Sequence, residues 1–495
     1  MPRKTTQSPA KMAKNPITSR CAEQPTQRPL HCIDLFAGCG GLSLGLEQAG
    51  FKPLLFSEIS PSAADTYQAN RSDAGIIHVP DIHDLTDTKL TKLKANWKST
   101  RGITDIDLVC GGPPCQGYSG IGHRRTFKLA KNEIPSNQLY KEMVRVIRAI
   151  RPKAFLFENV RGLLNARWTP EGKSGEIFRA VLAEFRSLSK YRIHWSLLHA
   201  KDYGVPQNRP RVIMVGLRDD VLPSWVQQRL FELSHERPNA VEQKFLPEPT
   251  GTPPTLPELL SDLEDPHYEN KTSNTVYLSN PANDFQAMFR TMRDKKLLGR
   301  GADLTGHEYS SHADYIRKKF QHMIDHGGAI PAQFKTKKFA QRVFPEKWGP
   351  GGPNITATSL PDDYVHYKEA RSPTVREWAR LQTFPDWYVF KGPARRAAAV
   401  ARGTLALATG AVKFPSTPRS AMRFPFSWPG RLGNISLESF GAHDESRVHS
   451  DFRGCQAAWP ARHRGWFSGA DSHRVAQGHN PKNGGQRHVP SARRF

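Results

Sequence analysis

The sequence predicts an α/β fold, with an open and mainly parallel β-sheet and a smaller second domain. Three observations support this prediction. Short apolar segments alternate with helical patterns between residues 31 and 216. A glycine-rich turn follows the first apolar segment, as in proteins that bind a ligand at the carboxyl ends of parallel strands. From residue 218 to about 345 the alternation disappears, and proline and charged residues dominate.

Apolar runs and helical periodicity define the individual elements. In residues 137–150, for example, Met143, Val146 and Ile147 share one apolar helical face. We expect strands at 31–36, 54–60, 105–110, 151–160, 193–199 and 212–216, and helices at 42–50, 61–70, 137–150, 175–188 and 372–382. The last helix should have Ser372 as its N-cap and Pro373 at its first position.

Length and composition limit the classes of protein that the chain can belong to. Its 495 residues are enough for two or more domains, and 71 Lys and Arg against 46 acidic residues give a formal net charge of +25. This excess favours nucleic acid over a membrane as the partner, and no apolar run approaches the length of a membrane span. Six cysteines without a CxxC pair predict neither a disulfide framework nor a metal site, and they indicate a reducing compartment.

The glycine-rich turn at 37–41 is the first candidate binding site. Its glycines let the backbone approach a ligand closely. Gly40 and Gly41 are adjacent and Ser43 replaces the third glycine of the dinucleotide-binding pattern, although a dinucleotide oxidoreductase stays possible on this turn alone. Glu58 ends the second predicted strand 20 residues after Gly38, the position from which a carboxylate reaches ribose hydroxyls.

The segment GGPPCQGYS, residues 111–119, follows the predicted strand 105–110. Pro113 and Pro114 restrict the backbone, so the thiol of Cys115 is held at the carboxyl end of a strand, where open α/β sheets bind ligands. Gln116 adds a polar contact beside it. A lone cysteine is more often a buried structural residue, but this turn favours a reactive one.

Two further segments carry candidate catalytic side chains. The strand 151–160 ends in Glu158 and Asn159 after three apolar residues, and an apolar environment favours the protonated carboxyl that a general acid needs. A structural role at the strand end is the alternative. Gln207, Arg209 and Arg211 alternate along an extended segment, which predicts that all three side chains leave the same face.

The segment around Cys115 resembles the catalytic loop of DNA (cytosine-5)-methyltransferases, and the resemblance extends from about Ile33 to about Gly392 with the motifs in that family's order. It implies a Rossmann-like S-adenosylmethionine-dependent methyltransferase domain with a smaller target-recognition domain. It also implies double-stranded DNA as substrate, methylation of carbon 5 of cytosine, and often a restriction endonuclease as functional partner. We expect a cytoplasmic monomer.

The resemblance also implies roles for particular residues. Cys115 is the nucleophile, Glu158 holds or protonates the base, and Arg209 and Arg211 bracket it. The cofactor is expected to contact Asp34, Phe36, Gly38, Gly40, Glu58, Asp81, Ile82 and Pro113, and the substrate to contact Gln116, Asn159 and Gln207. The match at Asp81 is weaker than the others, because Pro80 stands where the family usually has glycine.

Composition and the resemblance together divide the chain into five parts. We expect a disordered basic arm at 1–29 from its composition, the catalytic domain at 30–217, the target-recognition domain at 218–345 and a return to the catalytic domain at 346–393. Residues 394–495 contain 14 Arg and 2 Lys against five acidic residues, a net charge of +11, and have no periodic core. They lack the segment that closes the cofactor pocket in the family, and we interpret them as a disordered or frameshifted extension.

Three alternatives remain at this point. A tRNA cytosine-5 methyltransferase carries a Cys-Phe-Thr triplet in its recognition region, whereas no cysteine occurs here between Cys115 and Cys455. A catalytically impaired DNA-binding relative is supported only by the atypical tail. A dinucleotide oxidoreductase accounts for neither the Pro-Pro-Cys-Gln turn nor Glu158-Asn159-Val160.

Overall fold

The computed structural model describes residues 28–71, 75–114, 138–222, 238, 240–242, 245–268, 273–335, 341–345 and 364–392. All of these residues belong to one compact unit of the chain. Cys115, Gln116, most of the basic arm and the tail lie outside the described residues, so the predictions about them stay predictions.

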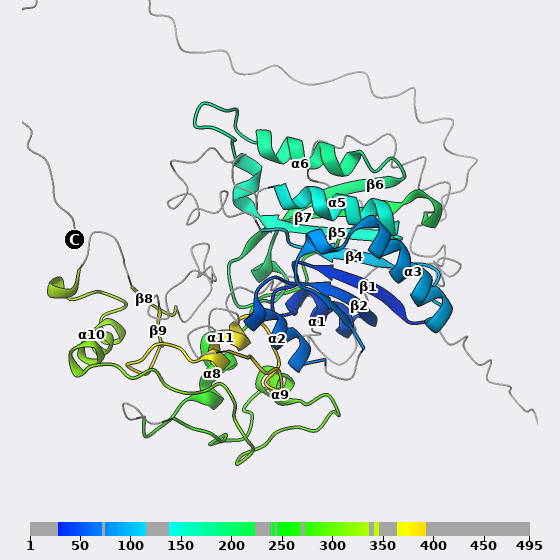
Figure 1. Ribbon diagram of the computed structural model, residues 1–495. Helices are drawn as coiled ribbons and strands as arrows, with labels where there is room; N and C mark the ends of the chain where they lie inside the picture. Colours follow the sequence, from blue (N-terminus) through cyan, green and yellow to red (C-terminus); the bar gives the residue numbers. More distant parts are fainter. Residues whose placement is uncertain are drawn as a thin grey trace, which may run out of the picture. The chain divides into compact units, whose positions relative to one another are not determined.

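A seven-stranded sheet in the order β3-β2-β1-β4-β5-β7-β6 forms the centre of the protein (Figure 1). β7 runs antiparallel to both β5 and β6, and the other strands are parallel to one another. The predicted α/β fold is therefore confirmed, with one reversed strand. The strands are β1 Leu30–Leu35, β2 Phe51–Ser57, β3 Ile77–Val79, β4 Leu108–Gly111, β5 Ala154–Val160, β6 Tyr191–His199 and β7 Pro210–Arg218.

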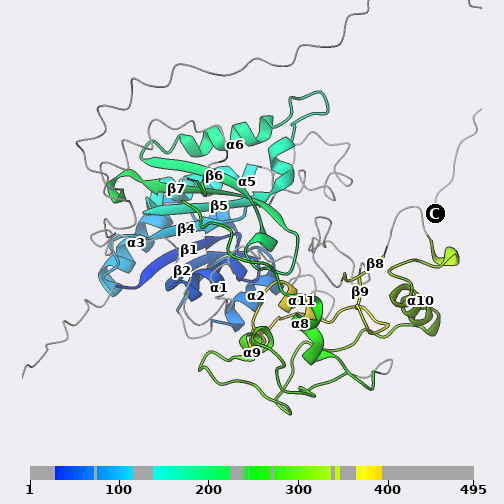
Figure 2. The same ribbon diagram turned by 180° about the vertical axis from the view of Figure 1, so that it is seen from behind.

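Helices cover both faces of this sheet (Figures 1 and 2). One face carries α1 Gly41–Gln48 and α2 Pro61–Ala69, and the other carries α3 Asp87–Arg101, α5 Leu139–Ile150 and α6 Glu176–Arg186. Met143, Val146 and Ile147 of α5 are fully buried, as the periodicity predicted. Within the described residues, no helix is both long and apolar enough to cross a membrane.

A second group of elements follows the sheet. It contains α8 Leu256–Leu260, α9 Asp284–Arg290, α10 Asp314–Asp325, β8 Arg342–Val343, β9 Tyr364–Val365 and α11 Val375–Leu381. Short 3-10 helices occur at Ile82–Asp84, Arg161–Asn165, Ala200–Asp202, Asp219–Val221, Ser261–Leu263 and Ala332–Phe334. Leu259 of α8, Phe289 of α9 and Trp378 of α11 belong to one apolar core, so residues 256–304 and 364–390 are built around common packing.

Buried ion pairs join the same two stretches of chain. Asp262 accepts hydrogen bonds from both Arg290 and Arg380, and Arg380 also binds Asp386. All four residues are at most 5% exposed. Removing one partner from such a network leaves an uncompensated buried charge, which typically costs about 3–5 kcal/mol.

The start of α11 differs from the prediction. Thr374, not Ser372, is the N-cap: its hydroxyl accepts from the Glu377 amide, and the Glu377 carboxylate accepts from the Thr374 amide. This reciprocal pair is a capping box. Pro373 therefore precedes the helix instead of occupying its first position.

Candidate active site

A cavity of about 180 Å³ lies at the edge of the sheet where β1, β4 and β5 end. The parallel register places Leu35 beside Gly111 and Gly111 beside Phe157, so these three strands end at the same edge. Eight of the predicted site residues line the cavity, namely Asp34, Phe36, Gly38, Pro113, Glu158, Asn159, Arg209 and Arg211. Residues from four separate segments of the sequence thus meet at the carboxyl ends of the parallel strands, where the sequence analysis predicted the binding site.

Glu158 and Arg211 form an ion pair in this cavity. Arg211 Nε lies 2.5 Å from Glu158 Oε1, and Arg211 and Glu158 are 7% and 8% exposed, respectively. Arg211 comes from β7, where it lies opposite Val160 of β5. From the three apolar residues before Glu158 we had expected purely apolar surroundings. This expectation is wrong, because the neighbouring strand β7 supplies a guanidinium group.

Gly112 lets the turn after β4 approach this carboxyl group. A Cβ atom on Gly112 would lie 2.7 Å from Glu158 Oε2, which is too close for any other residue without a shift. Asn159 holds the same turn from β5, because its Nδ2 donates to the carbonyl oxygen of Pro113 at 3.2 Å. The close approach of Gly112 to Glu158 and the hydrogen bond from Asn159 to Pro113 hold the backbone in place shortly before Cys115.

Arg209 also faces the cavity and is only 4% exposed. Burial lowers the pKa of its guanidinium well below the usual value, and the neighbouring Arg211 lowers it further. Two guanidinium groups lining one small cavity favour a ligand that carries carbonyl or anionic oxygens, because the planar fork of arginine binds such oxygens in pairs.

Gln207, unlike these two arginines, does not line the cavity. It is fully buried, and its Nε2 donates to Gln382 Oε1 at 2.9 Å and to the Leu381 carbonyl at 3.3 Å. The predicted common face is therefore wrong for Gln207, because β7 begins only at Pro210 and the chain before it does not keep the strand's alternation. In this structure Gln207 connects the start of β7 to the end of α11.

The predicted cofactor residues of the glycine turn are held by internal hydrogen bonds. Asp34 is 1% exposed and accepts a 2.6 Å hydrogen bond from Ser43, and burial raises its pKa to about 6. Glu58 accepts from the Gly38 amide at 2.8 Å, which fixes the turn against the end of β2. Gly38 has a φ of +57°, a conformation that favours glycine.

Asp81 and Ile82 lie at the end of β3 and do not line this cavity. Asp81 caps the 3-10 helix that follows, and hydrogen bonds from the His83 amide and ring lower its pKa. Ile82 is buried. Ile59, directly after Glu58, is 72% exposed, and the sequence analysis did not single it out.

The described cysteines are poor candidates for a nucleophile. Cys32, Cys39 and Cys110 are buried, and none of the three forms a disulfide. Burial raises the pKa of the Cys32 and Cys110 thiols well above the usual value, which disfavours the reactive thiolate. Among the described residues, no group of three or more His, Cys, Asp or Glu side chains is arranged to hold a metal ion.

Residues 30–402 match the family model of the C-5 cytosine-specific DNA methylases. The chain belongs to this family. It is a DNA (cytosine-5)-methyltransferase, and the family uses S-adenosylmethionine as methyl donor. The dinucleotide oxidoreductase is thereby excluded. The match extends ten residues beyond Gly392, near which the sequence analysis placed the end of the resemblance.

Individual relatives support the same assignment. The methyltransferase is 30% identical over 364 residues to the type II methyltransferase M1.HphI of Haemophilus parahaemolyticus, covering 73% of this chain and 79% of the relative. It is 31% identical over 376 residues to the type II methyltransferase M.DdeI of Desulfomicrobium norvegicum, covering 73% and 80%. A putative DNA modification methyltransferase encoded within an E. coli prophage has the same fold, with a TM-score of 0.54 at 23% identity over 77% of this chain and 97% of that one.

Proposed function

We propose that this methyltransferase belongs to a type II restriction-modification system. It methylates carbon 5 of cytosine within one double-stranded DNA sequence and so protects DNA from a separately encoded endonuclease. The observation that carries the proposal is the cavity in which the Glu158–Arg211 pair faces the turn that leads to Cys115. The type II relatives favour DNA over tRNA as substrate. We propose that the enzyme is a monomer and that it acts in the bacterial cytoplasm, where its substrate, double-stranded genomic DNA, is found.

The residues at the sheet edge fit S-adenosylmethionine. Glu58 offers a carboxylate for ribose hydroxyls, and the exposed Ile59 offers an apolar contact for adenine. Asp81 Oδ1 is used by His83, and we propose that its second oxygen meets the adenine amino group. The glycine turn borders the cavity, so the methyl-bearing end would face Pro113 and Glu158. The cofactor supplies an electrophilic methyl group at this point.

The chain's own residues prepare cytosine to accept that methyl group. The Cys115 thiolate adds to carbon 6 of the ring, which makes carbon 5 nucleophilic. Glu158 holds or protonates ring nitrogen 3, while Arg211 binds the exocyclic oxygen and Arg209 supports the same side of the base. Once carbon 5 carries the methyl group, loss of its proton to a base such as water breaks the carbon 6–sulfur bond and releases the thiolate.

A stacked cytosine cannot reach this cavity, which lies at the strand ends within the protein. The base must rotate out of the duplex, at a cost of a few kcal/mol. We propose that phosphate contacts made by the strongly basic chain offset this cost, since its formal net charge is +25.

The test of this function is the methylation of DNA in cells that express the chain. A host without cytosine methylation is transformed with the gene, and its DNA is sequenced for 5-methylcytosine. We expect one short sequence to be methylated throughout the genome. Binding of cofactor and DNA without any 5-methylcytosine would instead support the catalytically impaired relative, and methylation confined to tRNA would support the tRNA enzyme.

Exchange of the proposed recognition segment should change the methylated sequence. The proposed domain spans 218–345, but Asp262 and Arg290 within it belong to the buried network of Arg380 outside it. We therefore expect a chimera that exchanges only 310–345 to fold better than one that exchanges 218–345. The site methylated by the chimera is read by sequencing, and thermal unfolding shows whether the chimera is folded. An unchanged site in a folded 310–345 chimera would contradict this placement of the specificity residues.

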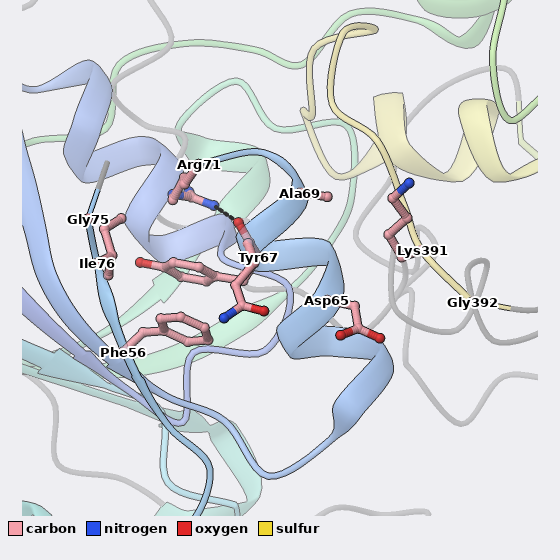
Figure 3. Close-up of a pocket in the computed structure, with 10 residues that line it drawn as sticks. Phe56, Asp65, Tyr67, Ala69, Arg71, Gly75, Ile76, Lys391 and Gly392 are labelled. Atoms are coloured by element: carbon pink, nitrogen blue, oxygen red, sulfur yellow. Dashed lines mark hydrogen bonds between the residues drawn. The ribbon is translucent and has the colours of Figure 1, made fainter. Parts of the chain in front are cut away.

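The atypical tail should weaken the enzyme. Lys391 and Gly392 border a second cavity, of about 730 Å³, together with Phe56, Tyr67 and Arg71 (Figure 3). The chain continues from this point into residues 394–495, which lack the family's closing segment. We propose that the continuation is frameshifted, and we expect weak cofactor binding and slow methylation.

Resequencing the gene around codon 393 tests the cause, and calorimetric titration with S-adenosylmethionine tests the effect. The control is a chain in which residues after Pro393 are replaced by the corresponding segment of a relative, which should bind more tightly. Low-micromolar binding and normal turnover by the original chain would show that its own tail closes the pocket.

A further inference from the structure

Arg71 lies two residues after α2, outside the active-site cavity, and its side chain binds several separate segments. Its side chain is 2% exposed. Its Nε and one terminal nitrogen bind both oxygens of Glu47 at 2.8 Å, and the latter nitrogen also donates to the Gly40 carbonyl at 3.0 Å. The other terminal nitrogen donates to the Tyr388 hydroxyl at 3.0 Å. One guanidinium thus joins α1, the glycine turn and a segment 317 residues away.

The shape of the glycine turn depends on this guanidinium. Gly40 has a φ of +84°, and a Cβ atom there would lie 2.7 Å from both an Arg71 terminal nitrogen and the Tyr67 ring. Gly40 does not line the active-site cavity. Its missing side chain therefore makes room for Arg71 and Tyr67, whereas Gly38 in the same turn does border the cavity.

The segment 384–390 holds the turn from the other side. The Tyr388 hydroxyl accepts from Arg71 and donates to the Cys39 carbonyl at 2.5 Å. Asn70, the residue before Arg71, exchanges two hydrogen bonds with the Val389 backbone. The carbonyl oxygens of residues 39 and 40 are thus bound by two side chains that bind each other.

Stacking extends this arrangement toward the cavity. The Arg71 guanidinium lies 4.1 Å from the centre of the Tyr67 ring, and Tyr67 stacks on Phe56 at 3.8 Å (Figure 3). The Tyr67 hydroxyl meets Ser43, which donates to Asp34 in the cavity wall. Contacts therefore run without interruption from the segment 384–390 to the cavity.

We infer that Arg71 is a positioning residue, which holds the glycine turn in its cofactor-binding shape and ties that shape to the segment 384–390. This inference rests on the proposed cofactor site. Lysine cannot replace arginine here, because a single ammonium cannot bind Glu47, Gly40 and Tyr388 at their separate positions. Arg71 touches neither the base nor the reacting atoms, so its loss should weaken cofactor binding more than it slows the chemical step.

The test compares Arg71→Lys and Tyr388→Phe with the unmodified full chain. The Kd for S-adenosylmethionine is measured by calorimetry, and kcat and KM by methyl transfer from labelled cofactor to DNA. We expect each variant to raise the Kd and KM for the cofactor, by about 10- to 100-fold for Arg71→Lys, with kcat and DNA affinity changed less than about threefold. The loss of cofactor-binding free energy in the double variant should be smaller than the sum of the losses in the two single variants, because the two groups bind each other.

Arg218→Lys is the matched control. Arg218 also pairs with both oxygens of a carboxylate, Asp220, but lies where β7 ends, at the opposite edge of the sheet. Its replacement should leave the cofactor Kd unchanged. The inference is overturned if folded Arg71→Lys and Tyr388→Phe bind the cofactor as tightly as the unmodified chain. It is also overturned if Arg218→Lys loses as much cofactor affinity as they do. Either result leaves the proposed function intact. Absence of any cofactor binding by the unmodified chain overturns both.

Discussion

The Cys115→Ser protein is expected to lose methyl transfer by at least about a thousandfold while it still binds S-adenosylmethionine. A thiol is partly ionised near neutral pH, whereas a serine hydroxyl is not, so serine cannot add to carbon 6 of cytosine. Cofactor binding should persist because the thiol acts on the base. Labelled-methyl incorporation into DNA measures the first effect, and calorimetry measures the second.

Cys21→Ser is the control for this substitution, since Cys21 lies in the basic arm. Its activity should equal that of the unmodified chain. Retention of more than a few per cent of activity by Cys115→Ser would exclude a covalent mechanism. A duplex with 5-fluorocytosine at the target gives an independent test, because fluorine blocks the final elimination. We expect the unmodified chain to form a protein–DNA complex that survives denaturation, and we expect the Cys115→Ser protein to form none.

The Glu158→Gln protein is expected to be slower by about 10²–10⁴-fold, the usual contribution of general acid catalysis. Glutamine keeps the shape of the side chain, and its carbonyl oxygen can still accept from Arg211, but it lacks the proton that stabilises the developing charge on ring nitrogen 3. DNA affinity should therefore change little. Single-turnover methylation measures the rate, and equilibrium titration with target DNA measures the affinity.

The ion pair with Arg211 adds a second consequence, since neutralising Glu158 leaves a buried guanidinium charge less well compensated. The melting temperature of Glu158→Gln should fall modestly, which thermal unfolding detects. Glu142→Gln is the matched control: Glu142 also pairs with an arginine, Arg145, but on α5. A loss of DNA affinity as large as the loss of rate would assign Glu158 a structural role instead.

Local sequence patterns were sufficient to predict most strands of the sheet and most residues of the cavity wall. Apolar runs predicted strands within a few residues of β1, β2, β4 and β5. Because parallel strands end at one edge, the residues that follow them were expected to meet, and Asp34, Pro113 and Glu158 do line one cavity. The reversal of β7 and the N-cap of α11 were not predicted, since pairing direction and caps depend on geometry that hydrophobic patterns do not encode.

The sequence by itself determined the family and the order of the reactive groups, because the chemistry requires particular side chains at strand ends. Only the tertiary structure decided that Arg211 pairs with Glu158, that Gln207 binds Gln382, and that Arg71 meets Tyr388. The last two contacts join residues separated by 175 and 317 positions. Such contacts depend on how distant segments pack, and no local periodicity or motif spacing carries that information.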